Sequence, residues 1–176
     1  SPSSSRTTSR TETTQALSKV NALIQLDSRS FEYHQIKLGL LAQLEHTTEI
    51  KKTYREMMTL FQDSALDLNT LAWIAVSSGP FELRDLETAW KAAQRAVELS
   101  ERRSAEILDT WARVHYELGF LEEAARLQAE AVAAAKDLPV QAELQSVLQY
   151  YRDALRLREK VKADVREKKP TPAPAP

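Results

Sequence analysis

Apolar residues recur at steps of three and four positions through most of this chain, a period typical of helices with one buried face. No stretch of useful length alternates apolar and polar residues as a strand would. The recurring positions are Leu86, Trp90, Ala93 and Val97; Leu108, Trp111, Ala112 and His115; Leu121, Ala124, Gln128 and Ala131; and Val140, Leu144, Val147 and Tyr151. The pattern predicts an all-α fold.

Glycine and proline indicate where these helices end and begin. We expect one helix to end near Gly79-Pro80 and another at Gly119, because glycine readily adopts the left-handed conformation that follows a helix. Pro139 suits the first turn of a last helix, where no amide proton is needed. Only 3 of the 176 residues are glycine, which also favours helices over a turn-rich fold.

Residues 107–132 form a pair of helical segments with small residues at regular points. Ala112 lies in the first segment, Gly119 in the turn, and Ala124 and Ala131 in the second segment. The pair resembles the tetratricopeptide repeat, a helical hairpin of about 34 residues. Small side chains at these points let neighbouring helices approach. The resemblance implies an α-solenoid of antiparallel helical hairpins with a C-terminal capping helix.

Other segments resemble the same repeat. The preceding pair has small residues at Ala72, Ala75, Ala89 and Ala96 and a longer turn over residues 77–83. Residues 31–61 match by spacing, with Ile36, Leu40 and Leu44 expected to face Ile50, Tyr54 and Met57. Residues 16–27 resemble the second helix of a further repeat. Residues 139–168 resemble the helix that covers the last apolar face of such arrays.

The composition of the two ends predicts linkers on either side of the repeats. We expect residues 1–14, which are rich in Ser, Thr and Arg, to be disordered. We expect residues 15–168 to form the repeat domain and residues 169–176 a Pro/Ala-rich extended tail. The chain opens with Ser1 instead of Met, so we expect a processed chain or a piece of a longer protein. Cytoplasm and periplasm both stay open as locations, the latter through a signal sequence since removed.

Composition and motifs argue against most kinds of chemistry. Cysteine is absent, the net charge is −1, and the three histidines have no partner at metal-ligand spacing. No phosphate-binding loop or nucleophile motif occurs. We therefore expect no enzyme activity, no cofactor, no metal site, no nucleic-acid binding and no membrane insertion. The Lys- and Arg-rich end of the last helix favours a solvated helix terminus over a basic binding arm.

The resemblance implies a binding groove along the inner faces of the first helices of consecutive pairs. At those positions stand Asn69, Trp73, Asp109, Arg113 and Tyr116. Arginine and aromatic residues dominate the binding energy of protein interfaces, so a protein or peptide partner is expected there. Trp90 and Trp111 fit packing positions and are assigned to the core. The Lys/Asn/Arg clamp of some tetratricopeptide proteins is not reproduced.

A narrower resemblance gives the alternative. Residues 68–73 and 107–112 are similar to repeat segments of bacterial thioredoxin-fold and envelope proteins, although no Cys-X-X-Cys is present. This resemblance implies a bacterial scaffold. The alternative function is a structural spacer or an oligomerisation segment of a larger protein. The oligomeric state and the partner's identity stay open.

Overall fold

The computed structural model describes residues 2–79 and 83–167. These residues form eight α-helices, and no strand occurs among them, which confirms the all-α prediction. The helices are α1 (Pro2–Leu26), α2 (Phe31–Gln43), α3 (Thr47–Leu60), α4 (Ala65–Ser77), α5 (Leu86–Leu99), α6 (Ala105–Glu117), α7 (Leu121–Ala134) and α8 (Leu138–Glu167).

Helices α2 to α7 alternate between two lengths. The first helices α2, α4 and α6 have 13 residues each, and the second helices α3, α5 and α7 have 14 each. Each first helix also begins in the same way. The hydroxyl oxygens of Ser30, Ser64 and Ser104 accept a hydrogen bond of 3.3 Å from the backbone N–H three residues later. Serine at this position satisfies an amide that the helix itself leaves free.

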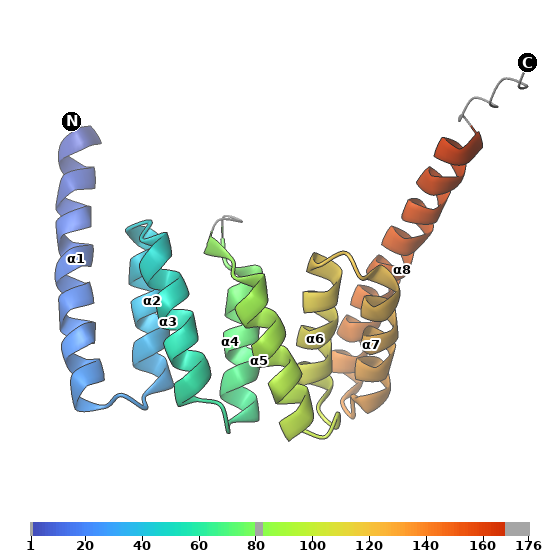
Figure 1. Ribbon diagram of the computed structural model, residues 1–176, viewed down its shortest axis with the longest axis horizontal. Coiled ribbons are helices and arrows are strands. Elements are labelled where there is room, and N and C mark those ends of the chain that lie inside the picture. Colours follow the sequence, from blue (N-terminus) through green and yellow to red (C-terminus); the bar gives the residue numbers. More distant parts are fainter. Residues whose placement is uncertain (1, 80–82, 168–176) are drawn as a thin grey trace, which may run out of the picture.

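Consecutive helices pack against one another in chain order (Figure 1). Contacts also join α3 with α5 and α4 with α6, so helices of the same kind lie side by side. This arrangement is compatible with a helical repeat.

The small residues at the predicted contact points are buried, as expected. Ala72, Ala75, Ala89, Ala96, Ala112, Ala124 and Ala131 have no exposed surface. The expectation for Ile36 is wrong, because this residue is exposed and the buried face of α2 carries Leu38 and Leu41. Residues two positions apart on a helix point about 200° away from each other, so burying Leu38 turns Ile36 to the outside.

Three of the helix connections have the same geometry, one of them between α5 and α6, where Glu101 has a φ of 51° and the N–H of Arg102 donates to the carbonyl of Val97 at 3.2 Å. Gly119 has a φ of 83° between α6 and α7, and Glu45 has a φ of 59° between α2 and α3. The N–H of Phe120 donates to the carbonyl of His115 at 2.9 Å, and that of His46 donates to Leu41 at 3.0 Å. The left-handed residue lets the chain turn back directly after the helix. Gly119 therefore ends its helix as predicted.

Helix α1 begins at Pro2, whereas the composition predicts disorder over residues 1–14. The hydroxyls of Thr13 and Thr14 donate to the carbonyls of Ser9 and Arg10 at 2.9 Å each. Such bonds let Ser and Thr side chains fold back on a helix instead of competing with it. Further along α1, Val20 is buried, and α1 packs against α2. The predicted tail over residues 169–176 lies outside the described residues.

The 30-residue helix α8 divides into two parts. Pro139 lies in its first turn, as predicted, and its first half buries Leu144, Leu148 and Tyr151. This half packs against α7. In the second half Arg158 still pairs with Glu122 of α7, and the last turns then continue away from the other helices (Figure 1). Leu157 in this half is exposed.

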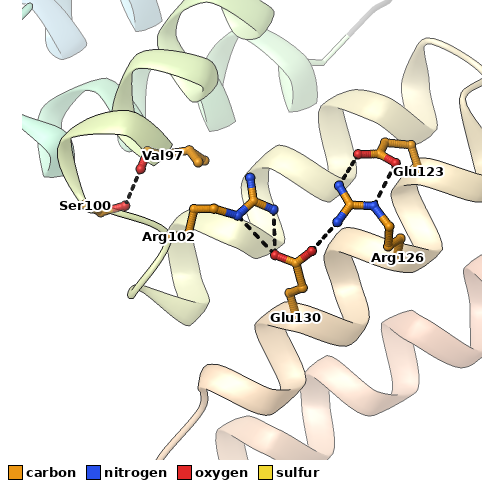
Figure 2. Close-up of polar contacts among 6 residues, drawn as sticks. All are labelled: Val97, Ser100, Arg102, Glu123, Arg126 and Glu130. Atoms are coloured by element: carbon orange, nitrogen blue, oxygen red, sulfur yellow. Dashed lines mark hydrogen bonds and ion pairs between the residues drawn. The ribbon is translucent and has the colours of Figure 1, made fainter.

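A group of charged side chains ties the connection between α5 and α6 to α7. Figure 2 shows that the guanidinium of Arg102 donates to Glu130, with one bond of 3.2 Å. Arg126 pairs with the same Glu130 and with Glu123. Arg102 has a left-handed φ of 58° and lies in the sharp turn between α5 and α6. Its side chain reaches Glu130 on α7 from this turn.

Candidate functional site

A pocket of about 320 Å³ opens between the first helices α4 and α6. It is lined by Asn69, Thr70, Trp73, Glu106, Asp109 and Thr110. Trp73 lies one helical turn after Asn69 and Thr70, and Asp109 and Thr110 lie one turn after Glu106, which places each set on one side of its helix. Three of the sequence-predicted site residues, Asn69, Trp73 and Asp109, are therefore brought together.

Sequence reasoning missed Glu106, Thr70 and Thr110. Glu106 precedes Asp109 by three positions, the spacing of neighbours on one helix face. Comparing each predicted site residue with its neighbours one turn away would have found Glu106.

Trp73 differs from the other two tryptophans in its surroundings. It is 44% exposed and makes no ring contact among the described residues. Trp90 and Trp111 pack edge to face with ring centroids 4.5 Å apart; Trp111 lies in the core cluster, and Trp90 is partly buried against that cluster. The assignment of Trp111 to the core is therefore confirmed, Trp90 packs at the edge of the same core, and Trp73 is exposed at the pocket.

Asn69 lines the pocket although it is only 3% exposed. Its Nδ2 donates to Oε1 of Glu106 at 3.2 Å, which joins α4 to α6. Its Oδ1 is buried and has no hydrogen-bond partner among the described residues. Buried polar atoms normally have partners, so this oxygen marks a position where a donor would be favoured.

Asp109 is held by a side chain of the core. Gln128 of α7 is fully buried, and its Nε2 donates to Oδ1 of Asp109 at 2.8 Å. The same nitrogen donates to the carbonyl of Leu144 in α8 at 3.2 Å. Burial raises the pKa of Asp109, while the hydrogen bond from Gln128 and the nearby charge of Arg113 lower it and the charge of Glu106 raises it further.

Arg113 and Tyr116 lie further along α6 and do not line this pocket. Nη2 of Arg113 pairs with Oε1 of Glu117 at 2.7 Å, and Arg84 pairs with the other oxygen of Glu117 at 3.2 Å. Arg113 is therefore engaged within the protein.

Tyr116 belongs to a group of three tyrosines. Its ring stacks on Tyr151 of α8 with centroids 4.7 Å apart, and its hydroxyl lies 2.9 Å from that of Tyr150. Helix α8 thus covers the part of α6 that the sequence assigned to the groove.

The histidines provide no site in the part of the chain that the structure describes. His34 and His115 are buried, and each has a ring nitrogen 2.9 Å from a backbone carbonyl, of Ser28 and Trp111 respectively. No group of three or more His, Asp or Glu residues there could hold a metal ion. Among the described helices, none is both long and apolar enough to cross a membrane.

No protein-family model matches this chain, and no curated protein matches it.

Proposed function

We propose that this chain is a tetratricopeptide-type α-solenoid that binds a protein or peptide partner and catalyses no reaction. The repeating helix lengths, the serine caps and the buried alanines support the solenoid. The pocket between α4 and α6 is the proposed site, since the first helices of such hairpins face the groove in the family that the sequence resembles.

The exposed indole of Trp73 is the observation that carries this proposal. A tryptophan left 44% exposed beside a pocket offers a large apolar surface that a partner can cover. Burying apolar surface is worth about 25 cal/mol per Å², and tryptophan is among the residues enriched at the centres of interfaces. Asn69 and Asp109, fixed by hydrogen bonds to other helices, supply polar groups that can orient the partner.

Selection from a library of displayed peptides tests the proposal. The wild-type protein should enrich a set of related peptides, and Trp73→Ala should abolish their binding while thermal unfolding stays unchanged. Leu26→Ala is the matched control, because it removes an exposed apolar side chain at the end of α1, which does not line the pocket. Enrichment that Trp73→Ala leaves intact, or no enrichment at all, would contradict the proposed site.

The second half of α8 favours a second candidate function, self-association. Leu157, Val161 and Val165 are exposed and repeat every four residues along one face. Two copies of this face would bury the stripe as paired helices do. Sedimentation over a range of concentrations should then show a dimer. Val161→Glu should weaken it, whereas Ala163→Glu, on another face of the same helix, should not.

A further inference from the structure

The polar atoms that line the pocket between α4 and α6 are mostly hydrogen-bond acceptors. The hydroxyls of Thr70 and Thr110 already donate to backbone carbonyls at 3.1 and 3.2 Å, so only their lone pairs remain. The carboxylates of Glu106 and Asp109 accept only. The remaining donors are the second amide proton of Asn69 and the indole N–H of Trp73. A ligand that donates hydrogen bonds therefore matches this lining better than one that accepts them.

The orientation of Asn69 makes the need for a donor specific. A carboxylate has no proton to give, so the amide nitrogen must be the atom that faces Glu106. In this orientation Oδ1 of Asn69 is the amide atom that does not contact Glu106, and it is buried without a hydrogen-bond partner among the described residues. A buried acceptor in this condition gains a full hydrogen bond when a ligand supplies a donor.

The negative charge of the pocket favours a positively charged ligand. Neither Glu106 nor Asp109 forms an ion pair within the described residues. The nearest candidate cation, Arg113, pairs with Glu117 instead, at 2.7 Å. Two carboxylates that form no ion pair repel an anion and attract a cation, most strongly where water is partly excluded, and the single nearby charge of Arg113 opposes two negative charges.

Trp73 adds a second feature that suits a cation. The face of an indole attracts an ammonium or guanidinium group that lies within about 6 Å of the ring. Lysine and arginine also carry aliphatic stems that can cover an exposed aromatic surface while the charged end reaches polar groups.

We infer that the pocket between α4 and α6 takes one lysine or arginine side chain of the partner. The charged end lies between Glu106 and Asp109 and donates to Oδ1 of Asn69, and the stem packs on Trp73. This inference rests on the proposed function and specifies the chemistry of the partner.

The sign of the ligand's charge is tested with small molecules, each of which carries a single functional group. The probes are n-butylammonium, n-butylguanidinium, butyrate and n-butanol, added to the whole chain at constant ionic strength. The side-chain amide of Asn69 and the indole N–H of Trp73 are followed by NMR. Saturable shifts are expected with the two cations and not with butyrate or n-butanol. Comparing the two cations shows whether lysine or arginine fits better.

Variants assign the effect to the pocket. Glu106→Gln removes one exposed charge and should weaken binding of the cations about two- to five-fold, the range for a partly exposed ion pair. Glu143→Gln removes the same charge from an exposed position on α8 and should change nothing. Trp73→Leu keeps an apolar side chain but removes the aromatic face, so it should also weaken binding of the two cations. The NMR spectrum of each variant confirms its folding.

The outcomes separate this inference from the proposed function. Saturable shifts with butyrate instead of the cations would overturn the inference and leave the pocket as a binding site. The inference would also fall if no probe shifted Asn69 or Trp73 while displayed peptides bound through Trp73. If neither probes nor peptides engaged Trp73, both the inference and the proposed function would fall.

Discussion

The side-chain amide of Gln128 on α7 donates a 2.8 Å hydrogen bond to the carboxylate of Asp109 on α6. Gln128 is fully buried, whereas Asp109 lines the open pocket, so the bond connects the candidate site to the core. The position of this pocket carboxylate therefore depends on how α6, α7 and α8 pack.

Replacing Gln128 with leucine should destabilise the protein. The apolar side chain has a similar volume but leaves the partly buried carboxylate of Asp109 without its donor, at a cost of about 1–3 kcal/mol. Urea unfolding at neutral pH measures the change. Gln94→Leu, at an exposed position on α5, should leave the free energy of unfolding nearly unchanged. Equal effects of the two substitutions would mean that the bond to Asp109 contributes nothing.

Two glycine-to-alanine substitutions should change stability in opposite directions. Gly119 has a φ of 83°, so Gly119→Ala should cost about 1–2 kcal/mol although no atom lies within 4 Å of the added carbon. Gly39 lies within α2, also with nothing within 4 Å, so Gly39→Ala should stabilise the helix by about 0.5–1 kcal/mol. Thermal unfolding measures both. A stabilising Gly119→Ala would rule out the left-handed turn.

Enlarging a buried alanine should reveal the close contact of α7 with its neighbours. Ala131 is fully buried, so Ala131→Leu should overpack the contact and destabilise by about 1–3 kcal/mol. Ala133→Leu makes the same change two residues later, at an exposed position, and serves as the control. The packing assigned to α7 would be incorrect if the two variants had the same melting temperature.

His115 should make the protein less stable in mild acid. Burial lowers the pKa of His115 below its ordinary value of 6.5, and the charge of Arg126 on α7 lowers this pKa further. The hydrogen bond to the carbonyl of Trp111 and the charge of Glu123 on α7 act in the opposite direction but do not outweigh burial. The unfolded chain therefore binds a proton before the folded one does as the pH falls. The free energy of unfolding should drop as the pH falls from 6.5 toward the lower pKa of folded His115, by about 1.4 kcal/mol for each unit of the shift.

Urea unfolding at about pH 7.5 and about pH 5.5 measures this dependence. The wild-type protein should lose more stability between the two values than His115→Gln, in which this group no longer titrates. The other histidines are present in both proteins, so their contributions cancel. An equal loss in the two proteins would contradict the assignment to His115.

The sequence predicted the parts of the fold that depend on local spacing. The period of apolar residues located the helices, and Gly119 and Pro139 located a turn and a helix start. The failures occur where spacing does not decide. Ile36 lies on the exposed face of α2, because a period of three or four fits more than one face of a short helix. The disorder predicted for residues 1–14 depends on composition and stays a prediction, although helix α1 begins at Pro2.

The candidate site was predicted only in part, for a related reason. The resemblance to a helical repeat predicted that Asn69, Trp73 and Asp109 lie on neighbouring helices, and these three residues do line one pocket. Register alone does not show that Arg113 turns to Glu117 or that α8 covers Tyr116. Those contacts depend on tertiary packing between segments distant in the sequence. The same limit hid the unpartnered Oδ1 of Asn69.

Fluorine NMR of protein labelled with 5-fluorotryptophan tests the central claim that a partner is held at the pocket between α4 and α6. The 3 tryptophans of the chain give separate signals, and Trp90 and Trp111 serve as internal controls because they pack in or against the core cluster and do not line this pocket. Adding a peptide selected by display should shift the signal of Trp73 and leave the other two in place. Binding that shifts Trp90 or Trp111 but leaves Trp73 unchanged would place the partner elsewhere and contradict the account.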